Sequence, residues 1–265
     1  MRFSEELCLF LNPLFTKKKV KGRGSSQAYS EAQYEWAKDS MQRYAPYVDL
    51  KGKVMLDAGC GPGGKTVYFS EQGVQSIIGL DLDPERIQYA KEFAASRKTD
   101  FPQFIVGNLA ALPFADDHFD VIFLNDVVEH IERPILIQAF RECKRVLKPG
   151  GRICLEFPPW TGFDAAHLYD YIHIPWCQVF FSDRTLLNVL NKLAPDVGTV
   201  SSVKYAQHYK ELNKITIREF KKMVREMEFK VIRIDLVILL KLQILKYVPF
   251  FNQYLTRRVL AVLSK

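Results

Sequence analysis

A glycine-rich stretch over residues 54–64 carries the residue types best suited to chemistry. It reads Val-Met-Leu-Asp-Ala-Gly-Cys-Gly-Pro-Gly-Gly, an apolar run that ends in a turn. Gly59, Gly61 and Gly64 satisfy the GxGxxG pattern of dinucleotide sites, whereas Gly59, Gly61 and Gly63 satisfy a tighter GxGxG loop. Because glycine lets the backbone approach a ligand closely, the stretch predicts a nucleoside-cofactor site without choosing the cofactor.

The carboxylate of Asp57, two residues before the first glycine, separates the candidate cofactors. It would repel the pyrophosphate of NAD or FAD, since pyrophosphate sites use helix N-termini and bare amides. S-adenosylmethionine (SAM) carries an ammonium and a sulfonium instead, so an anion favours it. Asp81 ends the next predicted strand and can accept hydrogen bonds from ribose hydroxyls, a role that both cofactor classes share. We therefore expect SAM as the cofactor.

Four blocks of sequence resemble class I SAM-dependent methyltransferases, specifically the type 11 group that includes quinone-biosynthesis methyltransferases. The resemblance runs from about residue 50 to residue 158, and its blocks are Leu-Asp-Ala-Gly-Cys-Gly-Pro-Gly (56–63), Ile-Gly-Leu-Asp (78–81), Ala-Leu-Pro-Phe (111–114) with Phe-Asp-Val-Ile (119–122), and Leu-Lys-Pro-Gly-Gly (147–151). It implies a SAM site built from Asp57, Gly59, Gly61, Gly63, Asp81, Leu82, Asn108, Leu109 and Asn125.

The residues after the third and fourth predicted strands receive separate roles from this resemblance. Asn108 stands where the family usually has an acidic residue, and its amide oxygen can still accept a hydrogen bond from the adenine amino group. The Leu109 backbone N–H would face the adenine ring, and Asn125 would lie near the methionine portion. The alternative is that these polar residues at strand ends only cap loops.

His130 is the candidate catalytic base. Methyl transfer from a sulfonium is an in-line displacement, so alignment supplies much of the rate and a base is needed only when the acceptor loses a proton. His130 follows the fourth predicted strand, and the ordinary pKa of histidine lies near neutral pH. The alternative is that Glu129 and His130 cap or orient the next helix.

The same segment also resembles a metal motif. Asp126-x-x-Glu129-His130 is similar to the ExxEH motif of small-RNA 3′-end 2′-O-methyltransferases and some quinone O-methyltransferases, which would take His167 or His173 as an extra ligand. Asp126 replaces the first glutamate and is one carbon shorter, and hard-cation sites are sensitive to ligand reach. We therefore assign no metal ligand from the sequence.

The predicted strands and helices that place these residues follow an α/β pattern. From residue 53 onward, strand and helix patterns alternate as in a parallel sheet covered by helices. Strands are predicted at 53–57, 75–81, 104–107, 119–125, 152–157, 229–237 and 257–263, and helices at 63–72, 84–96, 134–147 and 216–227. The resemblance implies a Rossmann-like, seven-stranded, mostly parallel sheet with helices on both faces and an antiparallel last strand.

Two segments interrupt this alternation. Residues 1–52 predict an N-terminal helical segment and a basic linker that cover the cofactor site, ahead of a methyltransferase domain over 53–265. Residues 158–213 predict a substrate-lid insertion rich in aromatic residues. Within it, His167, Tyr171 and His173 are the candidate substrate contacts, although most of these rings could instead pack the core of the lid.

Composition limits the classes of protein. The 265 residues are 48% hydrophobic and 25% charged, which excludes disordered and fibrous chains. The net charge of +7 is concentrated in residues 201–265, with 14 basic and 5 acidic residues. This tail predicts a solvated helix face or a peripheral membrane contact, because no RNA-binding signature accompanies it. Five cysteines without a CxxC pair favour a reducing, cytoplasmic location.

The sequence as a whole predicts a SAM-dependent methyltransferase that acts on a small-molecule or lipid-linked acceptor, at oxygen. One alternative is an RNA methyltransferase, for which salt-dependent RNA binding would be diagnostic. Another, from a different class, is a SAM-binding regulatory protein without catalysis. We expect nucleic acid not to be the partner, and the oligomeric state stays open.

Overall fold

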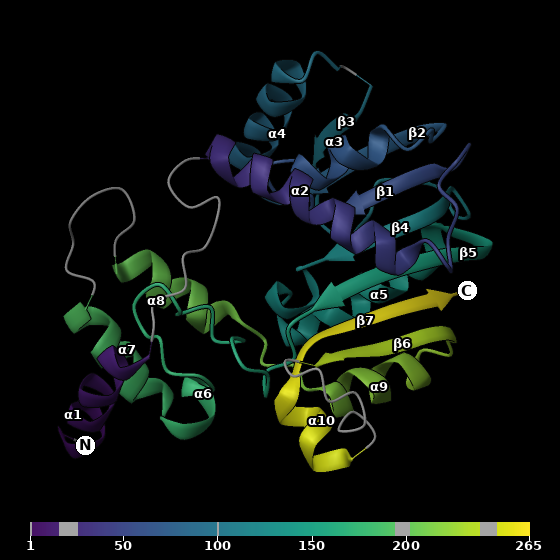
Figure 1. Cartoon of the computed structure of the whole chain (residues 1–265). Helices are drawn as coiled ribbons and strands as arrows, with labels where there is room; N and C mark the ends of the chain where they lie inside the picture. The colour runs from purple at the N-terminus through teal and green to yellow at the C-terminus, as the bar shows by residue number, and fades with distance from the viewer. Residues whose placement is uncertain (1, 16–25, 100, 194–201, 239–247) are drawn as a thin grey trace.

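A twisted sheet with helices packed around it forms the larger part of the molecule (Figure 1). The computed structural model describes residues 2–15, 26–99, 101–193, 202–238 and 248–265. Seven strands within these ranges form one sheet in the order β3-β2-β1-β4-β5-β7-β6. Their bounds are β1 Val54–Ala58, β2 Ser76–Asp81, β3 Gln103–Val106, β4 Phe119–Asn125, β5 Leu147–Phe157, β6 Lys230–Ile238 and β7 Thr256–Ser264.

The pairing of these strands confirms the expected topology. Strands β1 to β5 pair in parallel, whereas β7 runs antiparallel to both of its neighbours, β5 and β6. All seven predicted strands are present. The largest difference is in β5, which begins at Leu147 rather than at Arg152, because Leu147 pairs with Phe119 before a bulge shifts the register.

The four predicted helices are also confirmed, with ends that differ by no more than two residues. They are α3 Gly64–Ser70, α4 Pro84–Ser96, α5 Arg133–Val146 and α9 Ile217–Glu226. Helix α4 begins where Asp83 accepts a hydrogen bond from the Glu85 N–H and Pro84 occupies the first turn. Helix α9 begins with a capping box between Thr216 and Glu219.

Both faces of the sheet are buried, as the nearly continuous apolar strands predict. Along β4, Ile122 and Leu124 belong to the core cluster that contains α5 and α9. Val121 and Phe123, which alternate with them along the strand, belong to the cluster that contains α2 (Ser26–Tyr44) and α3. The alternation follows from the period of two along a strand.

The two described helices of the N-terminal segment go to different places. Helix α2 lies against α3, beside the sheet (Figure 1). Helix α1 (Arg2–Leu11), followed by the short helix η1 (Asn12–Leu14), packs instead against the insertion, whose helices are α6 Cys177–Phe180, α7 Asp183–Leu193 and α8 Ser202–Glu211. Cys8 is buried in one cluster with Leu186 and Tyr209. The predicted basic linker at 17–24 lies outside the described residues.

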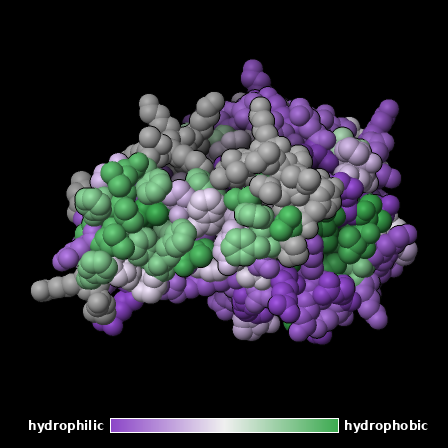
Figure 2. All heavy atoms as spheres, turned by 60° about the horizontal axis from the view of Figure 1, so that its bottom comes forward, coloured by the Kyte–Doolittle hydropathy of each residue, from purple (hydrophilic) through white to green (hydrophobic). Residues whose placement is uncertain are grey.

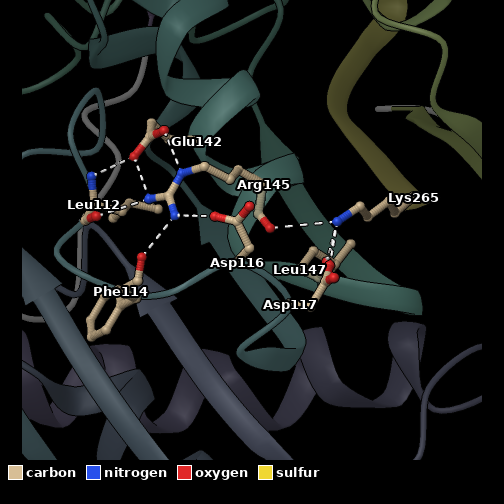
Figure 3. Close-up of polar contacts among 8 residues, drawn as sticks. All are labelled: Leu112, Phe114, Asp116, Asp117, Glu142, Arg145, Leu147 and Lys265. Atoms are coloured by element: carbon tan, nitrogen blue, oxygen red, sulfur yellow. Dashed lines mark hydrogen bonds and ion pairs between the residues drawn. The ribbon is translucent and has the colours of Figure 1, made fainter.

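Arg145 on α5 fastens the loop between β3 and β4 (Figure 3). Its guanidinium donates hydrogen bonds to the carbonyls of Leu112 and Phe114, at 3.0 and 2.8 Å, and forms ion pairs with Glu142 and Asp116. Glu142 in turn accepts the Leu112 N–H at 2.9 Å. A planar guanidinium with five N–H donors suits this role. Arg145 and Glu142 together thus hold the backbone of residues 112 and 114 by hydrogen bonds.

The last described helix, α10 (Pro249–Leu255), precedes β7. Within the described ranges, no helix combines the length and the apolar character needed to cross a bilayer. Lys241 and Lys246, two basic residues of the 201–265 tail for which a peripheral membrane contact is predicted, lie outside the described residues.

Candidate cofactor and acceptor site

The predicted cofactor residues meet at the carboxyl ends of the central parallel strands. Asp57 pairs in register with Gly79 of β2 and with Phe123 of β4. Two residues further along each strand, Gly59 therefore reaches the level of Asp81 and Asn125. This edge, next to the point where the strand order reverses, is where open α/β sheets bind ligands.

The glycines of the loop are required by its shape. Gly59 and Gly63 have φ values of +76° and +79°, in the left-handed region that other residues rarely adopt. A Cβ on Gly59 would lie 2.5 Å from a methyl carbon of Val127, and one on Gly63 would lie 2.6 Å from the Cβ of Ala90. The loop is therefore pressed between α4 and the segment after β4, and its backbone faces the site.

Asp57 is almost fully enclosed, with 2% of its surface exposed. The Thr66 hydroxyl donates a hydrogen bond of 2.6 Å to its Oδ2. Burial raises the pKa of Asp57 to about 6, partly opposed by the Thr66 hydrogen bond and by the positive charge of Lys65. A cationic group on a bound ligand would stabilise the ionised form of this buried carboxylate.

Asp81 has a role in the loop that the sequence analysis missed. Its Oδ2 accepts the Gly61 N–H at 2.9 Å and its Oδ1 accepts the Asp83 N–H at 3.0 Å. It therefore fastens the glycine loop to the end of β2. Each carboxylate oxygen keeps a further lone pair, so the predicted ribose contact stays a prediction.

The residues predicted to surround the adenine lie after β2 and β3. The side-chain oxygen of Asn108 accepts the Ala110 N–H at 2.9 Å, so the loop-cap role holds here and one lone pair is left for a ligand. Leu109 packs against the main core cluster, while Leu82 is exposed. Their predicted contacts with SAM stay predictions.

Asn125 offers a donor that needs a partner. The Tyr44 hydroxyl, from the end of α2, donates to Asn125 Oδ1 at 2.9 Å. Its Nδ2 is buried and has no hydrogen-bond partner among the described residues. An unpaired buried donor is costly, so a ligand with an acceptor at this position is favoured. The carboxylate of the methionine portion of SAM fits that requirement.

Helix α2 closes the outer side of the glycine loop. Ser30 donates from its hydroxyl to the Pro62 carbonyl at 2.8 Å, and Gln33 accepts the Gly64 N–H at 3.2 Å. Neither residue carries a recognisable motif, and their contacts depend on the docking of a helix far away in the sequence. Of the N-terminal segment, α2 thus contacts the glycine loop, whereas α1 packs against the insertion. The predicted cover of the cofactor site by residues 1–52 stays a prediction.

A network of charges lies beside Asn125. Asp126 forms ion pairs with Lys65, at 2.8 Å, and with Arg258 of β7. These two cations hold the pKa of Asp126 well below its usual range against the effect of burial. Both carboxylate oxygens are therefore engaged. This geometry argues against Asp126 as the first ligand of an ExxEH-like metal site.

Glu129 and His130 lie in the short helix η2 (Val128–His130), just after β4. Glu129 is 4% exposed, and burial raises its pKa to about 8. His130 Nε2 lies 3.8 Å from Glu129 Oε1, and burial and the nearby His208 lower the pKa of His130 to about 4. Helix α5 has Glu132 at its N-cap, so neither residue caps it.

Of the three predicted substrate contacts, His167 is the one that meets His130. The ring centroids of these two residues are 5.2 Å apart. His167 and His173 both line a cavity of about 120 Å³ inside the insertion, whereas Tyr171 packs against the helical core there. The segment turns at Leu168, whose carbonyl accepts the N–H groups of Tyr171 and Ile172, so these side chains do not alternate as on a strand.

Comparisons with known proteins agree with this geometry. Residues 56–155 match the family described as "Methyltransferase domain". An uncharacterized methyltransferase of Mycobacterium tuberculosis is 37% identical over 116 residues, 44% of this chain and 43% of that protein. A phosphoethanolamine N-methyltransferase of Triticum aestivum is 34% identical over 120 residues, 44% of this chain and 23% of that protein. The chain thus spans less than half of the length of these two relatives.

A solved structure extends the likeness to the whole fold. The S-adenosylmethionine-dependent methyltransferase of Mesorhizobium loti superposes with a TM-score of 0.57 at 15% identity, over 89% of this chain and all of that one. The chain therefore has the class I methyltransferase fold. Its segment 56–155, which holds the glycine loop, Asp81, Asn108 and Asn125, is the part that matches the methyltransferase-domain family.

Proposed function

We propose that the protein is a SAM-dependent methyltransferase that acts on a small-molecule or lipid-linked acceptor. The observation that carries the proposal is that two buried polar groups at one sheet edge can each take a ligand group. The buried carboxylate of Asp57 can take a cation, and Asn125 Nδ2, which has no hydrogen-bond partner among the described residues, can donate to an acceptor. The amino-acid portion of SAM has one ammonium, which can bind Asp57, and one carboxylate, which can accept a hydrogen bond from Asn125. The methyltransferase domain match supports the same cofactor.

For the acceptor, the proposal is a hydroxyl group, such as that of a phenol or a quinol. His130 lies beyond Asn125 at the same edge and faces the insertion through His167, so it is the candidate group to receive the hydroxyl proton. His167, Tyr171 and His173 stay the candidate substrate contacts. A cytoplasmic location is part of the proposal, since all five cysteines are buried free thiols.

Calorimetry with SAM, followed by transfer of a labelled methyl group to fractions of a cell extract, tests this function. We expect SAM to bind in the micromolar range typical of cofactor sites, and label to enter a small-molecule or lipid fraction. Label in RNA, with binding that weakens steeply in salt, would favour the RNA methyltransferase alternative instead. SAM binding with no labelled fraction would favour the non-catalytic regulator, and no SAM binding would refute the proposal.

A lipid-linked acceptor has support from the surface of the molecule. Phe3, Leu7, Phe10 and Leu14 follow helical spacing and are all exposed, Phe3 by 76%. Phe180 of α6 and Phe250 of α10 are exposed by 70% and 67%. Figure 2, which brings the bottom of Figure 1 forward, shows hydrophobic groups over this side of the molecule. An exposed apolar face of this kind fits the surface of a lipid bilayer.

Removal of two aromatic anchors from α1 tests this surface. We expect the double variant Phe3→Ser, Phe10→Ser to bind vesicles of phosphatidylcholine and phosphatidylglycerol at least about tenfold more weakly than the unaltered protein, since each buried Phe contributes about 2 kcal/mol. Co-sedimentation measures the binding. Phe101→Ser, which removes an exposed ring beside β3, is the matched control and should bind as before. Equal binding by all three proteins would contradict a membrane role for α1.

A further inference from the structure

Three of the five histidines of the chain gather at one point beside the sheet edge. His130 comes from η2, His167 from the loop after β5 and His208 from α8. The ring centroid of His130 lies 5.2 Å from that of His167 and 4.8 Å from that of His208. Segments that are separate in the sequence thus bring the same type of side chain together.

The arrangement suits a transition-metal ion. One ring nitrogen from each histidine lies within 4.8 Å of the other two, and all three residues are partly open to solvent. Metal–imidazole bonds of about 2.0–2.1 Å would require each ring to move inward by about 1 Å or less. Imidazole nitrogens favour Zn²⁺, Cu²⁺, Ni²⁺ or Fe²⁺, whereas Mg²⁺ and Ca²⁺ prefer oxygen.

A buried carboxylate next to the histidines is an independent sign of a missing cation. Both carboxylate oxygens of Glu129 are buried, and neither has a hydrogen-bond partner in the described part of the chain. Glu129 Oε1 lies 3.8 Å from His130 Nε2, on the side of the cluster. Lys65 and Arg258, the cations of this region, form their ion pairs with Asp126 instead. Buried carboxylate oxygens without a hydrogen-bond partner are costly, and a divalent ion among the histidines would offset that cost.

We propose that His130, His167 and His208 bind one divalent first-row transition-metal ion, with Glu129 as the adjacent buried carboxylate that balances its charge. Three histidines leave a coordination position for water or for an acceptor oxygen, as in catalytic zinc sites. The bound ion would tie η2 to the insertion. It would also lower the pKa of an acceptor hydroxyl bound to it, so that solvent water can take the proton, in place of the transfer to His130 in the proposed function.

Metal binding does not require methyl transfer, so it can be tested without SAM. The protein is stripped with a chelator and titrated with Co²⁺, whose visible d–d absorption reports nitrogen coordination, and bound Zn²⁺ is then counted by elemental analysis. We expect one ion per chain, with Zn²⁺ displacing Co²⁺. Because each variant removes one of the three histidine ligands, His167→Ala and His208→Ala should each weaken Co²⁺ binding by more than tenfold.

His118→Ala is the matched control, because His118 stacks on Phe114 and meets Phe119 edge to face, at the other end of β4. It should keep the stoichiometry and the absorption spectrum of the unaltered protein. Saturating Zn²⁺ should raise the Tm of the unaltered protein and of the control but not that of the two cluster variants, provided all of them unfold cooperatively. Glu129→Gln offers a second, less disruptive variant, for which we expect weaker Zn²⁺ binding and a changed Co²⁺ spectrum.

Two results would overturn the inference. One is an unaltered protein without stoichiometric Co²⁺ or Zn²⁺ at micromolar concentrations. The other is binding that is the same in His118→Ala and in the cluster variants, which would place the ion elsewhere. Either result leaves the SAM assignment intact, whereas loss of SAM binding leaves the metal titration interpretable. The two proposals therefore fail separately.

Discussion

Asp57→Asn is expected to stabilise the ligand-free protein and at the same time to weaken SAM binding. The carboxylate is buried, and its pKa of about 6 lies above the ordinary value of 3.8. The folded state therefore binds this proton more tightly than the unfolded state, so the ionised side chain opposes folding at neutral pH. The difference between about 6 and 3.8 corresponds to at most about 3 kcal/mol. The amide keeps an oxygen that can accept the Thr66 hydroxyl.

The sign of the pH dependence follows from the same difference. As pH falls from 8 through about 6 towards 4, the contribution of Asp57 to stability should rise, because its folded-state pKa is the higher one. SAM binding should show the opposite trend, because the ammonium needs the ionised carboxylate, and the affinity should fall by up to about tenfold per pH unit below 6. Chemical denaturation and calorimetry at several pH values measure both.

Asp120→Asn is the matched control for this prediction. Asp120 accepts the Val54 N–H at 2.9 Å and pairs with Lys148, and these contacts outweigh burial and lower its pKa. Its replacement should reduce stability at pH 7 and leave SAM affinity unchanged. If Asp57→Asn lost stability as this control does, Asp57 would be a structural cap and the assignment of the ammonium site would be wrong.

Gly63→Ala should cost far more stability than Gly52→Ala, although both glycines have positive φ values of +79° and +68°. The left-handed backbone penalises any Cβ by about 1–2 kcal/mol at either position. At Gly52 no atom of the described residues, the two chain neighbours of the glycine aside, lies within 4 Å of the added Cβ, whereas at Gly63 the Cβ and Cα of Ala90 lie at 2.6 and 2.9 Å. Overpacking of this kind adds about 1–3 kcal/mol, since α3 and α4 must separate.

Urea denaturation measures the two losses, and calorimetry adds the effect on SAM binding. We expect a total loss of about 3–4 kcal/mol for Gly63→Ala and weaker SAM binding, because the loop backbone shifts. Adding Ala90→Gly removes one of the two overlapping carbons and should restore part of the loss, which a double-mutant cycle detects as coupling. Equal losses at Gly63 and Gly52 would show that the loop is not pressed against α4.

The sequence predicted the sheet well because its signals are local and repeated. Each strand from β1 to β5 carries its own apolar run, β2 and β4 end at polar residues, and β1 and β3 are each followed by a glycine. Asp57, Asp81 and Asn125 could therefore be placed at one edge from the sequence alone. Segment 1–52 was harder. Helix α2 contacts Pro62 and Gly64 through Ser30 and Gln33, polar residues whose role depends only on docking.

The acceptor side shows the limits of local patterns more sharply. Spacing grouped Asp126, Glu129 and His130 as a motif, yet in the folded chain Asp126 pairs with Arg258, which is 132 residues away. His208 joined the cluster without any sequence signal, because α8 is brought there by the packing of the insertion. The predicted substrate residue Tyr171 packs against the helical core of the insertion, next to the turn at Leu168, a placement that depends on tertiary packing and not on a local pattern.

The position of α1 has a consequence for how the chain folds. Its Cys8 is buried with Leu186 and Tyr209, and its Glu5 accepts hydrogen bonds from Asn188 and Lys192, all more than 170 residues later. During synthesis α1 leaves the ribosome long before these partners exist, so its apolar side stays uncovered while the first five strands assemble. Contacts of such long range close late. We therefore expect the insertion to be the last part of the protein to become resistant to proteolysis.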